Sequence, residues 1–209
     1  MKLPLHRAAR LAAALAAAGL LGACAPLLFG GAVVGSAMVA TDRRTSGTQL
    51  EDQAIELKSL NRVSELLGDR AHVSTTSYNR MVLLTGEVPS EADKAAAEQT
   101  VARIENVRSI VNELGVMGNT SITSRSSDSI LTGKVKASFV DARDLMANSV
   151  KVVTERGTVY LMGRVTEREA KRASDLARSI GGVQKVVRVF EILSEAELAD
   201  MLPKAAAKP

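Results

Sequence analysis

Hydrophobic and polar residues alternate in two short segments of the chain that repeat each other 77 positions apart. The matching residues are Val82, Leu84, Gly86 and Val88 in the first segment and Val159, Leu161, Gly163 and Val165 in the second. A period of two is typical of a half-buried strand. Each segment follows another candidate strand, 71–77 or 149–154, across a short polar turn, 78–80 or 155–157. The pattern therefore predicts a β-hairpin in each half of the chain.

A helical pattern follows each hairpin. Apolar residues recur at i, i+4 and i+7, as Ala97, Val101 and Ile104 in the first copy and as Ala173, Ala177 and Ile180 in the second. Ser90 and Thr166 precede these segments and are residue types that cap helix N-termini. Final strands are predicted at 107–116 and 183–193, where the offset between the copies has shortened to 76.

Another amphipathic helix opens each half. Its apolar stripe consists of Ile55, Leu60, Val63, Leu66 and Leu67 in the first copy and of Leu131, Val135, Phe139 and Ala142 in the second. The predicted fold class is therefore α+β, with two tandem α-β-β-α-β domains, each a three-stranded mixed sheet covered by two helices. Gly86 and Gly163 are interpreted as structural, because glycine inside a strand marks a bulge or a close approach of backbones.

The first 23 residues have the pattern of a secretory signal. Basic residues precede a short alanine- and leucine-rich run, and small residues then lead to Cys24, the only cysteine. The segment 21–24 resembles the lipobox of bacterial lipoproteins. That resemblance implies cleavage before Cys24, a diacylglycerol on its thiol and an N-acyl chain on its new amino group. An ordinary signal peptide with an unrelated cysteine is the alternative.

The rest of the chain divides by composition. Residues 24–48 are expected to comprise the lipidated cysteine, an apolar collar and a polar tether, although a Gly31–Gly35 pair would also suit a membrane-spanning helix. The two domains are expected at 49–118 and 128–193, joined by a flexible linker at 119–127. A short helix and a disordered tail are expected at 194–209.

Two such units behind a lipobox resemble the BON domain family, in particular its dual-domain outer-membrane lipoproteins. The residues that carry the resemblance are Cys24, 41–42, 47–49, 82–86, 150–152 and the block 161–171. The resemblance implies a lipid-anchored protein on the periplasmic face of the outer membrane that supports envelope integrity. It also implies that the second domain binds an anionic phospholipid, phosphatidylglycerol or cardiolipin, and suggests a link to the machinery that assembles outer-membrane β-barrels.

The two domains differ in charge although they share a fold pattern. Residues 49–118 carry seven basic and eleven acidic groups, whereas residues 119–193 carry thirteen basic and eight acidic groups. Only the second domain would be attracted to an anionic membrane surface. Without the signal the chain has a net charge of only +1, and its aromatic content is 2%. Neither value suits a nucleic-acid-binding protein.

The opening helix of the second domain, at about 128–145, is the predicted phospholipid contact. The site residues are Ile130, Leu131, Lys134, Val135 and Lys136. Ile130 lies about 100° from the buried stripe, where it would insert into a bilayer while the lysines meet headgroups. The alternative is that Ile130 packs under the linker or the hairpin. The family has an aromatic residue at this position, so the resemblance predicts weaker interfacial anchoring here.

The chemistry-bearing residues do not suggest an enzyme. Acylation of Cys24 removes the only thiol, and His72 is the only histidine after the signal, so catalytic triads and metal clusters have too few ligands. His72 is interpreted as a surface or edge residue without a partner. We therefore predict no catalytic residue, no metal site and no cofactor other than the acyl groups of Cys24.

Two other functions remain open at this point. One is a protein-interaction adaptor or chaperone, in which the exposed edge of a three-stranded sheet pairs with a strand of a partner such as an outer-membrane assembly protein. The other is a structural role, in which the tandem domains only space or tile the envelope.

Overall fold

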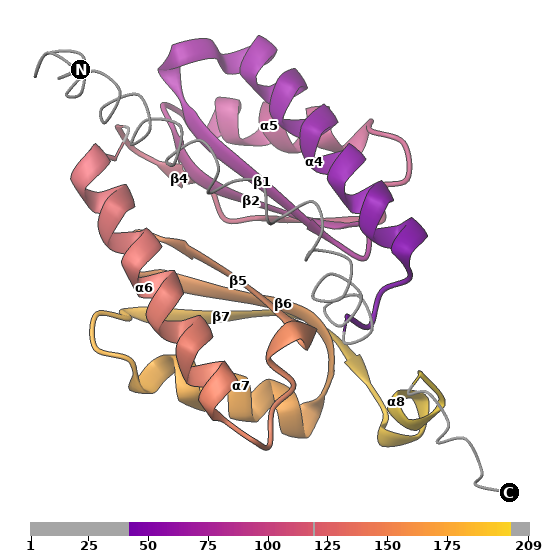
Figure 1. Cartoon of the computed structure of the whole chain (residues 1–209). Helices are drawn as coiled ribbons and strands as arrows, with labels where there is room; N and C mark the ends of the chain where they lie inside the picture. Colours follow the sequence, from indigo (N-terminus) through magenta and orange to yellow (C-terminus); the bar gives the residue numbers. More distant parts are fainter. Residues whose placement is uncertain (1–41, 119, 202–209) are drawn as a thin grey trace, which may run out of the picture. The chain divides into compact units, whose positions relative to one another are not determined.

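Both halves of the chain fold as α+β domains in the computed structural model, which describes residues 42–118 and 120–201 (Figure 1). The first domain contains α4 (Ser46–Leu67), a 3-10 turn (Gly68–Arg70), β1 (His72–Tyr78), β2 (Met81–Val88), α5 (Glu91–Ala102), β3 (Ser109–Asn112) and β4 (Gly115–Val116). The second domain contains α6 (Ile122–Asp141), a 3-10 turn (Ala147–Ser149), β5 (Val150–Glu155), β6 (Thr158–Thr166), α7 (Glu167–Ser179) and β7 (Lys185–Leu193), and α8 (Glu195–Met201) follows it. The predicted α+β class and element order are confirmed.

Each sheet is mixed, as predicted. In the first domain β1 pairs antiparallel with β2, and both β3 and β4 pair parallel with β2. In the second, β5 pairs antiparallel with β6, which pairs parallel with β7 along its whole length. The last strand of the first domain is interrupted because Asn112 accepts a hydrogen bond from the Leu114 amide, which turns the chain away from the ladder before Gly115. The first sheet therefore has four strands where three were predicted.

The two helices of each domain cover one face of its sheet (Figure 1). Ser90 and Thr166 cap α5 and α7, as expected, and Thr166 forms a reciprocal capping box with Glu169. The predicted stripe of α6 is buried against its sheet. The predicted stripe of α4 is partly wrong, because Leu60 and Leu66 are 47% and 43% exposed. Buried polar residues of α4 take part in its packed face instead, and these are Asp52 and Ser59.

The faces that the helices leave uncovered pack against each other. Because side chains alternate along a strand, the residues of β2 and β6 between the helix-facing positions point to the opposite side. An apolar cluster joins the two domains there, and it consists of Tyr78, Leu83, Tyr160, Met162 and Val189. Each sheet is thus buried on both faces, by its own helices on one and by the other domain on the other.

The structure confirms that Gly86 and Gly163 have a structural role. A Cβ atom at Gly86 would collide with the carbonyl oxygen of His72, and one at Gly163 would collide with the carbonyl oxygen of Ser149. Gly86 also has a φ of +111°, which L side chains rarely adopt. Both glycines thus allow the first strand of the hairpin to approach the second closely.

Two segments predicted to be flexible are ordered. The expected tether is part of the folded unit, since the side chains of Arg43 and Arg44 are only 5% and 13% exposed, and α4 begins at Ser46. The expected linker is largely helical, since α6 begins at Ile122 with Ser121 as its N-cap and ends at Asp141. The sequence signals failed there because serine- and threonine-rich segments also suit helix caps.

The signal segment, Cys24, the apolar collar and the tail 202–209 lie outside the described residues. Within the described ranges, no helix has the length and apolar character needed to cross a bilayer.

Candidate functional site

The predicted phospholipid-binding residues lie on α6, and the structure separates them into two faces. Ile130 is 62% exposed, and Lys134 and Lys136 are also exposed. The alternative that Ile130 packs beneath its surroundings is therefore wrong. Leu131 and Val135 are 7% and 0% exposed and belong to the domain core. Both turn toward the sheet, as residues one and five positions after Ile130 do on a helix of 3.6 residues per turn. Val135 is therefore shielded from lipid, whereas Leu131 also lines a cavity beside α6.

The outward face of α6 is more apolar than predicted. Ile122 and Val140 are 80% and 73% exposed, in addition to Ile130. At about 100° per residue, positions 18 apart lie on the same line along a helix, so Ile122 and Val140 face the same way and Ile130 lies beside that line. Lys134 and Lys136 fall on opposite sides of it. This face was not predicted because Ile122, its first residue, lies in the segment 119–127 that was expected to be a linker.

A cavity of about 620 Å³ lies next to this face of α6. Its walls include Ile130, Lys134 and Arg156, together with Gly181 and Gly182 of the loop after α7. The cavity therefore places two basic side chains next to an exposed isoleucine.

Asp128 shapes the floor of this cavity. It is 7% exposed and accepts hydrogen bonds from the backbone N–H groups of Arg156 and Gly157, each at 2.8 Å. This holds the β5–β6 turn against α6. Arg156 has a φ of +49°, a left-handed conformation that the carboxylate of Asp128 stabilises by accepting its N–H.

The equivalent helix of the first domain also exposes apolar side chains. Leu50 and Leu57 on α4 are 69% and 61% exposed. Its charge is different, however: α4 carries two basic and four acidic residues, whereas α6 carries three basic and two acidic residues. Both helices can thus present an apolar face, but α6 alone of the two has a basic excess.

The segment before α4 ties the two domains together. The guanidinium of Arg43 donates hydrogen bonds to both carboxylate oxygens of Glu169 at 2.8 and 2.7 Å and to the carbonyl oxygen of Arg164 at 2.7 Å. Arg44 pairs with Asp42 and Asp52 and lies 4.2 Å from the ring centroid of Tyr78. Burial would raise the pKa of Glu169, but the hydrogen bonds from Arg43 and from the Thr166 amide, together with the charge of Arg43, outweigh it and hold this pKa below its ordinary value.

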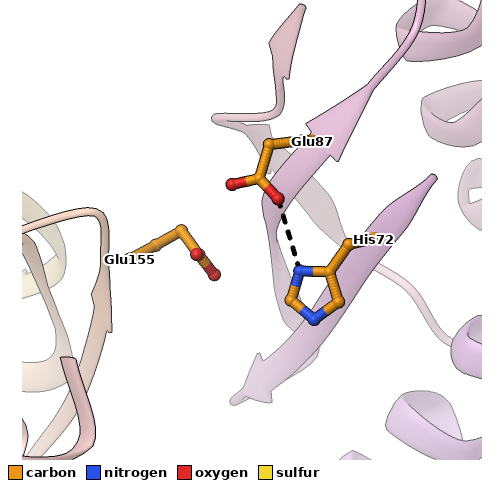
Figure 2. Close-up of side chains that lie close together, drawn as sticks. All are labelled: His72, Glu87 and Glu155. Atoms are coloured by element: carbon orange, nitrogen blue, oxygen red, sulfur yellow. Dashed lines mark ion pairs between the residues drawn. The ribbon is translucent and has the colours of Figure 1, made fainter. Parts of the chain in front are cut away.

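His72 begins the edge strand β1, as one part of its interpretation expected, but the expectation that it has no partner is wrong. Its side chain is 26% exposed, and its Nδ1 lies 3.5 Å from Oε2 of Glu87, which is fully buried. Glu155 of the second domain reaches the same place (Figure 2). Burial, together with the neighbouring carboxylates of Glu87 and Asp128, raises the pKa of Glu155 to about 7.

Comparison with known proteins places the chain in a family. The model of the BON domain matches residues 52–118 and again residues 127–194. The chain is 42% identical over 187 residues to "Outer membrane lipoprotein DolP" of Haemophilus influenzae, an alignment covering 88% of this chain and 96% of the relative. It is 32% identical over 151 residues to "21 kDa hemolysin" of Actinobacillus pleuropneumoniae, covering 71% and 78% of the two chains.

A more distant relative is "Osmotically-inducible protein Y" of Escherichia coli, at 28% identity over 148 residues and 67% and 72% coverage. The likeness to a solved structure of CdsD from Chlamydia trachomatis is weak, with a TM-score of 0.30 and 12% identity over 71% of this chain and 99% of that one. The two matched segments and the 42% identity agree with the repeat, the lipobox and the two domains of the structure. The chain therefore belongs to the BON domain family, as an outer-membrane, lipid-anchored protein with two BON domains in tandem.

Proposed function

We propose that this lipoprotein supports the integrity of the cell envelope and binds anionic phospholipid through α6 of its second BON domain. The observation that carries the proposal is the outward face of α6, where exposed apolar side chains lie between two exposed lysines. An amphipathic helix of this kind lies in the membrane interface with its apolar side chains below the headgroups and its lysines among them. The acidic α4 is repelled by the same surface.

The cavity beside α6 suggests where a headgroup binds. Lys134 and Arg156 both line it, and Ile130 stands at its wall. A phosphate held between the two cations leaves the acyl chains next to the isoleucine. Phosphatidylglycerol and cardiolipin both offer a phosphodiester and no cationic group, so both suit this arrangement. A zwitterionic headgroup brings its own cation to the two basic side chains and binds more weakly.

The lipid anchor and α6 have different roles in this proposal. Cys24, with its diacylglycerol and N-acyl chain, keeps the protein on the outer membrane, because two or more acyl chains anchor a protein stably. The contacts of α6 then select the lipid and orient the domains. No catalytic step is required, and we propose a non-catalytic binding protein.

The decisive experiment measures co-sedimentation of the mature chain with vesicles, using a Cys24→Ser form so that no acyl chain contributes. Binding is expected to vesicles containing phosphatidylglycerol and to be at least about tenfold weaker with pure phosphatidylcholine. Ile130→Glu should abolish the binding, because it replaces an inserting side chain with an anion. Binding should also fall as salt is raised, since exposed charges are screened.

Leu57→Glu is the matched control. Leu57 is 61% exposed on α4 and Ile130 is 62% exposed on α6, so the two substitutions disturb folding to a similar extent. Only the α6 variant should lose vesicle binding. Equal binding by Ile130→Glu and wild type contradicts the proposal. If vesicle binding is absent altogether, crosslinking in intact cells tests the other candidate, an adaptor acting with outer-membrane assembly proteins.

A further inference from the structure

His72, Glu87 and Glu155 bring three metal-ligating side chains to one point between the two domains. Each offers a ligand atom, and these atoms lie within 4.8 Å of one another. Figure 2 shows the imidazole and the two carboxylates directed toward each other from different strands. None of the three ligands lies on the exposed face of α6 or lines the cavity beside it, although Arg156 lines that cavity and also faces Glu87.

The two ligands from the first domain are held in place by the sheet. His72 on β1 is directly opposite Glu87 on β2 in the antiparallel register, so their Cβ atoms are neighbours on the same face, about 5 Å apart. The close approach of the strands at Gly86 fixes this pair further. Glu155, the last residue of β5, completes the group from the second domain.

The hydrogen bonding of the cluster is incomplete. Glu87 is fully buried, yet its Oε1 has no hydrogen-bond partner, and its Oε2 accepts one bond from the Thr120 amide at 3.2 Å. The Nδ1 atom of His72 is also buried without a hydrogen-bond partner. A buried carboxylate with an unsatisfied oxygen is costly unless a cation compensates it. Arg156 supplies only part of this, because its Nε lies 3.5 Å from Glu87 Oε1 outside hydrogen-bond geometry.

We propose that His72, Glu87 and Glu155 form a divalent transition-metal site, best suited to zinc, that links the two BON domains. Imidazole and carboxylate ligands are the donors that zinc accepts, at bond lengths of about 2.0–2.2 Å. Tetrahedral coordination requires ligand atoms roughly 3.4 Å apart, so the side chains close around the ion by rotation. The exposed edge of His72 leaves room for a water molecule as the fourth ligand.

The charges around the cluster determine how tightly an ion binds. Asp128 is a third carboxylate near the cluster and favours a bound cation. Arg125 and Arg156 are positively charged and disfavour one. Arg156 is the direct competitor, because it faces Glu87. Its guanidinium also contacts Sδ of Met117 at 2.7 Å, so it has another partner when the ion takes Glu87. Removal of this arginine should therefore tighten metal binding.

The test is a zinc titration of the mature chain as its Cys24→Ser form, free of any histidine tag, against a chromophoric zinc chelator at pH 7.5. His72 is then the only histidine and no thiol is present, so a single imidazole can contribute. One zinc ion per chain is expected. His72→Gln and Glu155→Gln should each weaken binding at least about tenfold, and Arg156→Gln should strengthen it. Zinc should also raise the melting temperature of the wild type.

Glu56→Gln is the matched control, because Glu56 pairs with Lys151 across the same two domains at 2.7 Å but lies outside the cluster. It should leave zinc affinity unchanged. Circular dichroism establishes that each variant is folded. His72→Gln and Glu155→Gln change different domains, so each tests the site separately. The proposal is overturned if wild type binds no zinc below about 1 mM, or if zinc affinity is the same in folded His72→Gln and wild type.

Discussion

Positions 77 residues apart occupy equivalent places in the two hairpins but carry different chemistry at the interface between the domains. The pairs are His72 with Ser149, Tyr78 with Glu155, and Glu87 with Arg164. One end of the interface therefore contains the acidic Glu87 and Glu155, whereas the other contains Tyr78 near the backbone of Arg164. The pseudo-symmetry of the fold does not extend to its electrostatics.

The difference shows which positions a tandem repeat must keep. On the helix-facing side of β2 and β6, each side chain packs within its own domain. Equivalent positions there keep the same residue type, as valine at 82 and 159 and again at 88 and 165. On the other side each residue meets the other domain, whose sequence is different. A duplicated domain can therefore diverge there without loss of its own core, and this interface carries the proposed metal ligands.

The largest effect is expected from the ion pairs at the equivalent helix starts. Glu169 on α7 pairs with Arg43, and both side chains are 5% exposed, whereas Asp93 on α5 pairs with Arg70, which is 61% exposed. Arg43→Ala leaves a buried carboxylate unpaired and should lower the free energy of unfolding by about 3–5 kcal/mol. Arg70→Ala should lower it by less than about 1 kcal/mol. Urea denaturation measures both. Similar losses would contradict the assignment of residues 42–45 to the folded unit.

The paired glycines should give the next largest effect. Gly163→Ala introduces a collision with the Ser149 carbonyl, and Gly86→Ala combines the equivalent collision at His72 with an unfavourable positive φ. We expect losses of about 2 kcal/mol or more for Gly163→Ala and about 1 kcal/mol more for Gly86→Ala. Denaturation curves of the two variants provide the measurement. An equal or reversed order would show that the backbone relaxes at Gly86.

Two buried aspartates anchor the hairpin turns with different numbers of partners. Asp52 accepts hydrogen bonds from Ser77 Oγ, from the amides of Asn79 and Arg80 and from the guanidinium of Arg44, whereas Asp128 accepts two, both from backbone amides. Hydrogen bonds to a charged group are worth about 1.5–3 kcal/mol before replacement by a weaker acceptor is considered. Asp52→Asn should therefore cost about 2–3 kcal/mol and Asp128→Asn about 1–2 kcal/mol. Urea denaturation at pH 7 tests the order, which fails if Asp128→Asn is the more damaging.

The hydrophobic pattern predicted most of the fold because each signal was local. The alternation from Val82 to Val88 predicted a strand, and the capping chemistry of Ser90 and Thr166 predicted where two helices begin. The same local logic failed for Leu60 and Leu66, because the face of α4 toward the sheet is partly polar and Asp52 is buried to hold the turn. Local rules also treated 119–127 as a linker, although Ser121 caps a helix.

The sites were only partly predictable. The exposure of Ile130 followed from helix geometry, and the pairing of His72 with Glu87 could have been read from the hairpin register, since the turn at Asn79–Arg80 fixes every pair of the two strands. The approach of Glu155 could not. It depends on the packing of one sheet against the other, a contact between distant segments that no spacing along the chain encodes.

The smallest predicted effect is a difference in acid sensitivity. Burial would raise the pKa of Asp52, but hydrogen bonds from Ser77, from the Arg80 amide and from Arg44 outweigh it and hold this pKa below its ordinary value. An aspartate with a depressed folded pKa contributes stability above its unfolded pKa of about 3.9 and loses it as pH falls further. The free energy of unfolding of wild type should therefore decline below about pH 4, and that of Asp52→Asn should decline less steeply, because its amide does not titrate. Urea denaturation from pH 5 to pH 2 measures the two slopes.

Glu169, whose pKa is also lowered, is present in both proteins and leaves a residual slope in each. Parallel curves would mean that Asp52 anchors its turn without being ionised, and its hydrogen bonds would then match those of a neutral acceptor.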